Sequence, residues 1–287
     1  MTTTTPVPTL LPRLRALGLR PRKGLGQHFL SDPNILQAIV ADAELPPDAT
    51  VIEVGPGPGA LTAALIPTVA HLVAIELDAR LASWLSELYA PWPYVCILHG
   101  DALAMSPRQA LAHVGGAQTY FVLGNIPYYI TSPLLRHFLE ADTPPQRLVF
   151  TMQLEVARRI VARPPHMSLL AVSVQAYAHA RITRKLPPGA FTPPPKVHSA
   201  VLRLDALDKP LVTVAQRQTF FRVVKAGFGQ KRKTLRNSLA AGLGLSTATT
   251  EAALLAAGLN PRQRAQELAM DEWLRLVAFF YDEGRPK

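Results

Sequence analysis

A chain of 287 residues, of which 48% are hydrophobic, is long enough to form two domains with buried cores, and its composition excludes an intrinsically disordered protein. Its 30 lysines and arginines outnumber its 20 acidic residues, and the formal charge of +10 is typical of proteins that neutralise phosphate groups. A single cysteine, Cys96, excludes an internal disulfide, and no run of about 18 uncharged apolar residues indicates a membrane span, so we expect a cytoplasmic protein.

The first 18 residues are rich in threonine and proline, and we expect them to form a mobile arm. Because arginines occur here and no acidic residue precedes Asp32, a mitochondrial transit peptide is an alternative interpretation. Residues 33–43 are predicted to form a helix with Asp32 as its N-cap and Pro33 at its first position. Strands and helices then alternate to about Gln153, which is typical of a doubly wound parallel sheet.

A glycine-rich turn follows the first predicted strand of this sheet, residues 50–54. Gly55, Gly57 and Gly59 have the spacing G-x-G-x-G, not the G-x-G-x-x-G that brings a helix N-terminus against a pyrophosphate. The turn therefore indicates a nucleoside cofactor without phosphates. Glu76 ends the next predicted strand, about 20 residues further on, where such folds place an acid that accepts from ribose hydroxyls.

A third predicted strand, residues 95–98, runs towards Gly100, Asp101 and Ala102. The Asp101 carboxylate is suited to an adenine amino group, because it is an acceptor only. Each of these signals has a structural alternative: glycine turns are common, Glu76 could be an acid at a helix N-terminus, and Asp101 could be a cap.

Residues 125–130 (NIPYYI) follow a fourth predicted strand at 120–124. The side-chain oxygen of Asn125 and the carbonyl of Ile126 can accept the two hydrogens of an exocyclic amine. Pro127 biases Ile126 towards an extended conformation, and the ring of Tyr128 can stack on a planar base. The stretch predicts a site for chemistry on adenine or cytosine, although Asn, Pro and Tyr also form ordinary turns.

The second half of the chain is predicted to close the sheet and then to become helical. Residues 169–178 and 199–204 are predicted to be an antiparallel pair of strands separated by a proline-rich loop at 186–195. That loop is either a plain connector or a polyproline-like brace that sets Phe191 beside the base. Helices are predicted at 216–228, 232–241, 247–257 and 270–282.

Together these motifs resemble those of the S-adenosylmethionine-dependent ribosomal RNA adenine dimethyltransferases, most closely their bacterial small-subunit group. The resemblance runs from about residue 19 to residue 277. Besides the glycine turn, Glu76, Asp101 and the stretch at 125–130, it is carried by residues 23–30 (KGLGQHFL), 191–197 (FTPPPKV) and 230–239 (QKRKTLRNSL).

The resemblance implies a Rossmann-like class I methyltransferase, with a mostly parallel seven-stranded sheet, an antiparallel closing strand and a small all-α C-terminal domain. It implies a methyltransferase domain at 19–207 and a helical RNA-binding domain at 208–287, after the arm at 1–18. The implied S-adenosylmethionine ligands are His28, Leu30, Gly55, Gly57, Glu76, Asp101, Ala102 and Asn125. The implied catalytic, base-facing residues are Asn125, Ile126, Pro127, Tyr128 and Phe191. Tyr129 departs from the asparagine of many relatives, which affects fine specificity only.

The implied reaction transfers methyl groups to the N6 amines of two adjacent adenosines near the 3′ end of 16S rRNA, in an immature small ribosomal subunit. Acceptors at Asn125 and the Ile126 carbonyl would localise the nitrogen lone pair towards the methyl group, so no strong base is required before attack. We expect no metal, because the eight histidines show no ligand spacing and a sulfonium methyl is already electrophilic.

Two other functions remain as alternatives: a 23S rRNA adenine methyltransferase of the macrolide-resistance type, and a non-catalytic RNA-binding assembly or transcription factor. The complete set of Glu76, Asp101, Asn125 and Tyr128 argues against the latter. Basic residues cluster in the N-terminal arm, at 158–163 and at 222–236, where a structured RNA could contact several of them. Nothing in the sequence indicates an obligate dimer, and we expect a monomer.

Overall fold

The computed structural model describes residues 12, 18, 27–127 and 130–283. Most of the predicted arm, and the predicted site residue Tyr128, therefore lie outside the described residues. The chain divides into two compact units: residues 1–157 with 180–206, and residues 158–179 with 207–287. The last junction lies after residue 206, one position before the domain boundary expected from the sequence. Residues 158–179 group with the second unit, whereas the expected methyltransferase domain at 19–207 includes them.

The first unit is organised by a seven-stranded sheet with the strand order β4-β3-β2-β5-β6-β9-β7. The neighbours from β4 to β6 are parallel, and β9 is antiparallel to β6. This is the mostly parallel sheet with an antiparallel closing strand that the sequence predicts. The strands are β2 (Thr50–Val54), β3 (His71–Glu76), β4 (Val95–His99), β5 (Phe121–Asn125), β6 (Arg147–Gln153), β7 (Ala178–Leu186) and β9 (Ser199–Ala206).

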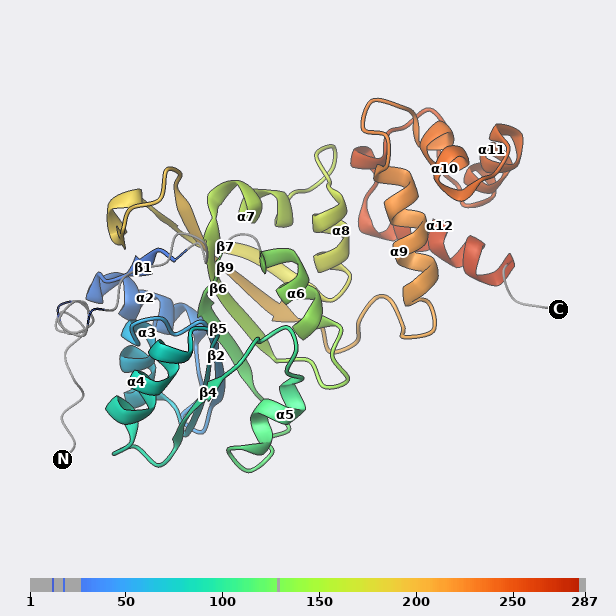
Figure 1. The fold of residues 1–287 in the computed structure, drawn as a ribbon. Coiled ribbons are helices and arrows are strands. Elements are labelled where there is room, and N and C mark those ends of the chain that lie inside the picture. Colours follow the sequence, from blue (N-terminus) through green and yellow to red (C-terminus); the bar gives the residue numbers. More distant parts are fainter. Residues whose placement is uncertain (1–11, 13–17, 19–26, 128–129, 284–287) are drawn as a thin grey trace. The chain divides into compact units, whose positions relative to one another are not determined.

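Helices cover both faces of this sheet (Figure 1). On one face lie α2 (Pro33–Ala43), α3 (Ala60–Leu65) and α4 (Ala79–Tyr89), with the 3-10 turn η3 (Ile66–Thr68) after α3. On the other face lie α5 (Pro107–Ala112) and α6 (Thr131–Leu139), and α7 (Leu154–Ile160) follows β6. The start of α2 confirms the sequence prediction, because the Asp32 carboxylate accepts hydrogen bonds from the amides of Asn34 and Ile35.

A small two-stranded sheet joins distant parts of the chain. Strand β1 (Phe29–Leu30) pairs antiparallel with β8 (Phe191–Thr192), which follows the 3-10 turn η5 (Pro188–Ala190). Leu30 and Phe191 are register partners, and both are buried in the apolar core formed with α2, α3 and the central strands. The proline-rich loop is thus a brace for the segment at 27–30, and it is not a bare connector.

Residues 169–178 correct the sequence analysis. They were predicted to be a strand, but residues Leu169–Gln175 form helix α8, and strand β7 begins only at Ala178. Every residue from 171 to 178 is buried, so the segment carries no periodic polar face. A continuous buried run of this kind suits a buried helix as well as a strand. The Ser168 hydroxyl accepts a hydrogen bond from the Ala171 amide and caps the helix.

The remainder of the second unit is helical, as predicted. Its helices are α9 (Arg217–Phe228), α10 (Leu235–Leu243), α11 (Thr247–Ala256) and α12 (Met270–Glu283), with the 3-10 turn η6 (Ala265–Glu267) before α12. Trp273 is fully buried and stacks on Phe228. Within the described part of the chain no single helix has the length and composition of a membrane span; α10 and α11 pass only as a pair, and a bend of 119° separates them.

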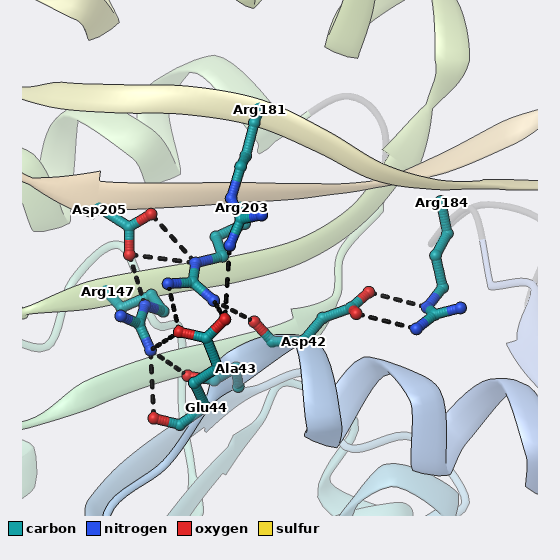
Figure 2. A network of polar contacts seen from close by, with 8 residues as sticks. All are labelled: Asp42, Ala43, Glu44, Arg147, Arg181, Arg184, Arg203 and Asp205. Carbon is teal, nitrogen blue, oxygen red and sulfur yellow. Dashed lines mark hydrogen bonds and ion pairs between the residues drawn. The ribbon is translucent and has the colours of Figure 1, made fainter.

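A network of arginines and carboxylates closes the C-terminal end of α2 (Figure 2). Arg203, on β9, is only 4% exposed; it donates to the Asp42 carbonyl and pairs with the carboxylates of Glu44 and Asp205. Arg147, on β6, reaches the same helix end through the carbonyls of Ala43 and Glu44. Cations at a helix C-terminus satisfy carbonyls that lack an intrahelical partner, so the network ties α2 to the sheet.

Candidate active site

A cavity of about 290 Å³ opens at the C-terminal edge of the parallel strands. It is lined by the residues that end or follow β2, β3, β4 and β5, by the segment at 27–30, and by Leu36 and Ile39 of α2. The order of the strands reverses between β2 and β5, and ligands of open α/β sheets bind at such a switch point.

The structure brings the predicted cofactor residues together in this one cavity. Its lining includes His28, Leu30, Gly55, Gly57, Glu76, Asp101, Ala102 and Asn125. The predicted base-facing residues Ile126 and Pro127 line it as well. Phe191 differs: it is 3% exposed, it lies in the apolar core, and it is not among the described residues that line the cavity.

The glycine turn wraps closely around neighbouring groups. Gly55, Gly57 and Gly59 all have left-handed backbone conformations, with φ of 66°, 56° and 77°. A Cβ atom at Gly57 would lie 2.9 Å from the ring of Phe29. The Gly57 amide donates to Oε2 of Glu76 at 2.9 Å. The turn therefore needs glycine both for its conformation and for space.

Glu76 ends β3 with its carboxylate held by main-chain amides. Its Oε2 accepts from Gly57, and its Oε1 accepts from the Asp78 amide at 2.9 Å. Burial raises the pKa of Glu76, although the amide hydrogen bonds oppose the shift. Each carboxylate oxygen keeps a further lone pair, so a rigid acceptor faces the cavity. The cap of α4 is Asp78 and not Glu76, which removes the structural alternative for Glu76.

Asp101 follows β4 and is exposed. Its Oδ1 accepts from the Leu103 amide at 2.9 Å, so the carboxylate closes a local turn, whereas the structural alternative named from the sequence was a cap. This bond fixes the carboxylate at the cavity edge without occupying both oxygens. The structural role and a ligand-binding role are thus compatible in this residue.

Asn125 is oriented by a long-range contact. Its Nδ2 donates to the His28 carbonyl at 2.7 Å, and because the amide is planar this directs Oδ1 away from His28. His28 is itself joined through Nδ1 to the carbonyl of Pro193 at 2.7 Å. The proline-rich loop therefore supports the segment that orients Asn125.

The sequence analysis missed several lining residues. Leu77 follows Glu76, is 49% exposed and lines the cavity with an apolar side chain. Glu53, within β2, is fully buried and accepts from the Thr62 hydroxyl at 2.7 Å. Desolvation raises its pKa to about 8, despite the opposing Thr62 bond. The sequence signal for Glu53 was its position as the lone acid in an apolar strand. Thr151 of β6 also lines the cavity, but no sequence pattern indicated it.

Among the residues that the structure describes, no group of three or more His, Cys, Asp or Glu side chains is arranged to hold a metal ion. The polar lining instead consists of carboxylates, the amides of Gln27 and Asn125, the His28 ring, the Thr151 hydroxyl and main-chain groups, together with apolar side chains. Such a mixture is typical of a site for an organic ligand with a few polar groups.

Comparisons with known proteins agree with this geometry. The family model described as ribosomal RNA adenine dimethylase matches residues 18–282. The Ribosomal RNA small subunit methyltransferase A of Dehalococcoides mccartyi is 42% identical over 266 residues, which cover 93% of this chain and 90% of the relative. The protein of the same name from Geobacter metallireducens is 42% identical and covers 92% and 96% of the two chains.

Two solved structures resemble this one over most of its length. The 23S rRNA methyltransferase ErmE has a TM-score of 0.69 and 30% identity, and covers 88% of this chain and 98% of its own. A dimethyladenosine transferase from Plasmodium falciparum has a TM-score of 0.76, covers 90% of this chain and 98% of its own, and at 23% identity supports the fold alone.

Proposed function

This chain belongs to the ribosomal RNA adenine dimethylase family, and from that premise we propose that it methylates the N6 amines of two adjacent adenosines near the 3′ end of 16S rRNA. The product is N6,N6-dimethyladenosine, and the substrate is an immature small ribosomal subunit. We further propose that the protein acts as a monomer in the cytoplasm. The relatives at 42% identity, which are named as small-subunit enzymes, support this choice of subunit.

The observation that carries the proposal is the common cavity of Glu76, Asp101 and Asn125, at the ends of three different strands. These groups fit S-adenosylmethionine. The Glu76 carboxylate can accept from the ribose hydroxyls, Asp101 can accept from the adenine amine, and Leu77 offers an apolar surface to the adenine ring. The turn at 55–59 allows close approach of the main chain without forming a pyrophosphate site.

When bound, S-adenosylmethionine supplies an electrophilic methyl group. The chain's own part is to position the acceptor amine. Oδ1 of Asn125 and the carbonyl of Ile126 accept its two hydrogens, which draws the nitrogen lone pair out of conjugation with the ring. Tyr128, outside the described residues, is proposed to stack on the base. Phe191 is buried beside Leu30, and we propose that it acts by supporting β1.

The second methyl transfer needs the singly methylated amine to return to the same place. One hydrogen is then replaced by a methyl group, so only one of the two acceptors keeps its partner. The apolar lining near Asn125, which includes Ile126, Pro127 and Ile130, suits an added methyl group.

The test is to incubate the protein with labelled S-adenosylmethionine and with immature 30S or 50S particles, and then to map the labelled nucleotides. Label on two adjacent adenosines of 16S rRNA is the expected result. Label on a 23S adenosine would favour the activity of the similar structure ErmE. RNA binding without transfer to either particle would favour a non-catalytic assembly factor and overturn the proposal.

A further inference from the structure

Thr151 is a cavity residue without an assigned role. It lies near the end of β6, it is 2% exposed as a whole residue, and it lines the cavity. It is the register partner of Asn125 on the adjacent parallel strand. Register partners on neighbouring strands point to the same face, and the strands are about 4.8 Å apart. The Thr151 hydroxyl is therefore next to the amide that is proposed to hold the acceptor amine.

The order of the strands places Thr151 on the acceptor side of Asn125. Read across the sheet, the groups at the strand ends are Asp101 after β4, Glu76 on β3, Gly55 after β2, Asn125 on β5 and Thr151 on β6. The two carboxylates proposed for the cofactor lie on one side of Asn125. A ligand that extends from Asn125 in the other direction meets Thr151 first.

The hydroxyl of Thr151 is available to a ligand. Among the described residues no hydrogen-bond partner of this hydroxyl occurs, whereas the nearby buried Thr62 donates to Glu53. The hydroxyl oxygen is not among the fully buried polar atoms that lack a partner, so it keeps accessible surface at the cavity wall, where a ligand can supply the partner. Asn125 Oδ1 and the Ile126 carbonyl are acceptors only, and the hydroxyl adds a donor.

We propose that the Thr151 hydroxyl donates a hydrogen bond to a ring nitrogen beside the amine of the acceptor adenine, N1 or N7. Both nitrogens are acceptors: N1 is bonded to the carbon that carries the amine, and N7 lies on the other side of the amine, one ring atom further away. This contact fixes the orientation of the base around its amine. Asn125 Oδ1 and the Ile126 carbonyl bind only the amine, so they define that orientation loosely. The inference rests on the proposed function, because it needs an adenine in the cavity.

Thr151→Val and Thr151→Ser separate the hydroxyl from the shape of the side chain. Valine keeps the volume and loses the donor, whereas serine keeps the donor. In single-turnover methylation of natural subunits, Thr151→Val should be about 3- to 10-fold slower than wild type, the usual effect of one hydrogen bond, and Thr151→Ser should stay within about 2-fold. Both variants should bind S-adenosylhomocysteine and unfold thermally as the wild type does.

The decisive measurement pairs the variants with altered bases. Small subunits are reconstituted on 16S rRNA that carries 1-deazaadenosine or 7-deazaadenosine at the methylated positions. On the analogue that lacks the accepting nitrogen, wild type and Thr151→Val should react at the same rate; on the other analogue the deficit of Thr151→Val should persist. If Thr151→Val is slower than wild type by the same factor on both analogues and on natural RNA, the inference is overturned. A wild type that fails to methylate natural subunits overturns the proposed function itself, and with it this contact.

Discussion

The side-chain Nδ2 of Asn125 donates a hydrogen bond to the main-chain carbonyl of His28, 2.7 Å away and 97 positions earlier in the chain. The contact joins the end of β5 to the segment that leads into β1. The same segment is held from its other side by Pro193, through Nδ1 of His28. The orientation of the Asn125 amide thus depends on three distant parts of the sequence.

Asn125→Ala should slow methyl transfer far more than it weakens cofactor binding. The variant loses the acceptor that holds the amine, and loss of one preorganised hydrogen bond of this kind costs about 100- to 1000-fold in rate. Affinity for S-adenosylhomocysteine, measured by calorimetry, should change by less than about tenfold. Asn125→Asp keeps an oxygen but cannot donate to His28, so it should also be slow. Wild-type rates in single turnover for either variant would contradict the role of Asn125.

Gly124→Ala should displace the strand that carries Asn125. A Cβ at Gly124 would lie 2.5 Å from the main-chain oxygen of Val54, and a backbone atom cannot move aside cheaply. We expect the free energy of unfolding in urea to fall by about 1–3 kcal/mol, the usual cost of overpacking, and methyl transfer to fall with it. Gly189→Ala is the matched control, because nothing lies within 4 Å of the Cβ position there. Equal stability of the two variants would show that β5 and β2 can separate freely.

The site was predictable wherever a strand ended in a distinctive residue. Apolar runs that lead to Gly55, Glu76, Asp101 and Asn125 identify strand ends, and the parallel arrangement then brings these residues to one edge. Thr151 was missed because a threonine inside an apolar strand is ordinary by sequence. The pairing of Leu30 with Phe191 was also beyond prediction, since no local pattern specifies a partner 161 residues away.

The fold was predictable for the same reason, except at residues 169–178. Amphipathic helices such as α2 and α9 were identified because one face is polar and the period is visible. Helix α8 has no exposed face over most of its length, so its apolar run resembled a buried strand. Only packing inside the second unit distinguishes the two conformations.

Glu53→Gln should remove a dependence of stability on pH. The pKa of Glu53 is raised by burial to about 8, whereas in the unfolded chain it is near the ordinary 4.5. Between these values folding takes up a proton, so the contribution of Glu53 is fully present below pH 4.5 and is lost as the pH rises to about 8. The slope is at most about 1.4 kcal/mol per pH unit for one group.

Urea unfolding from pH 5 to pH 8.5 tests this behaviour. The variant should match the wild type near pH 5 and become progressively more stable than it towards pH 8, since glutamine keeps an acceptor for the Thr62 hydroxyl but no charge. Glu87→Gln removes an exposed carboxylate from α4 and controls for the change in net charge. If the free energy of unfolding depended on pH in the same way for Glu53→Gln and wild type, Glu53 would ionise in the folded protein as it does in the unfolded one.

Arg203→Ala should destabilise the first unit more than Arg184→Ala. Arg203 is buried, and it donates to the Asp42 carbonyl and to the carboxylates of Glu44 and Asp205 (Figure 2). Its removal therefore leaves these acceptors without their donor. We expect Arg203→Ala to lower the free energy of unfolding by about 2–3 kcal/mol. This is below the usual cost of breaking a fully buried pair, because both carboxylates are partly exposed. Arg184 pairs with Asp42 at the surface, and its removal should cost less than about 1 kcal/mol. Chemical denaturation compares the two, and equal losses would show that burial of Arg203 adds nothing.

The loop before α10 should contribute to RNA affinity through charge alone. Lys231, Arg232 and Lys233 are exposed, and no ion pair involves them among the described residues. If they contact phosphates, changing all three to glutamine should weaken binding of 16S rRNA fragments and reduce the log-log slope of affinity against salt by about 2–3, roughly 0.7–0.9 for each lost contact. Arg275→Gln is the control, because Arg275 of the same unit already pairs with Asp271. Weaker binding with an unchanged salt slope would mean that the loop acts through its conformation, and that its positive charges do not meet phosphates.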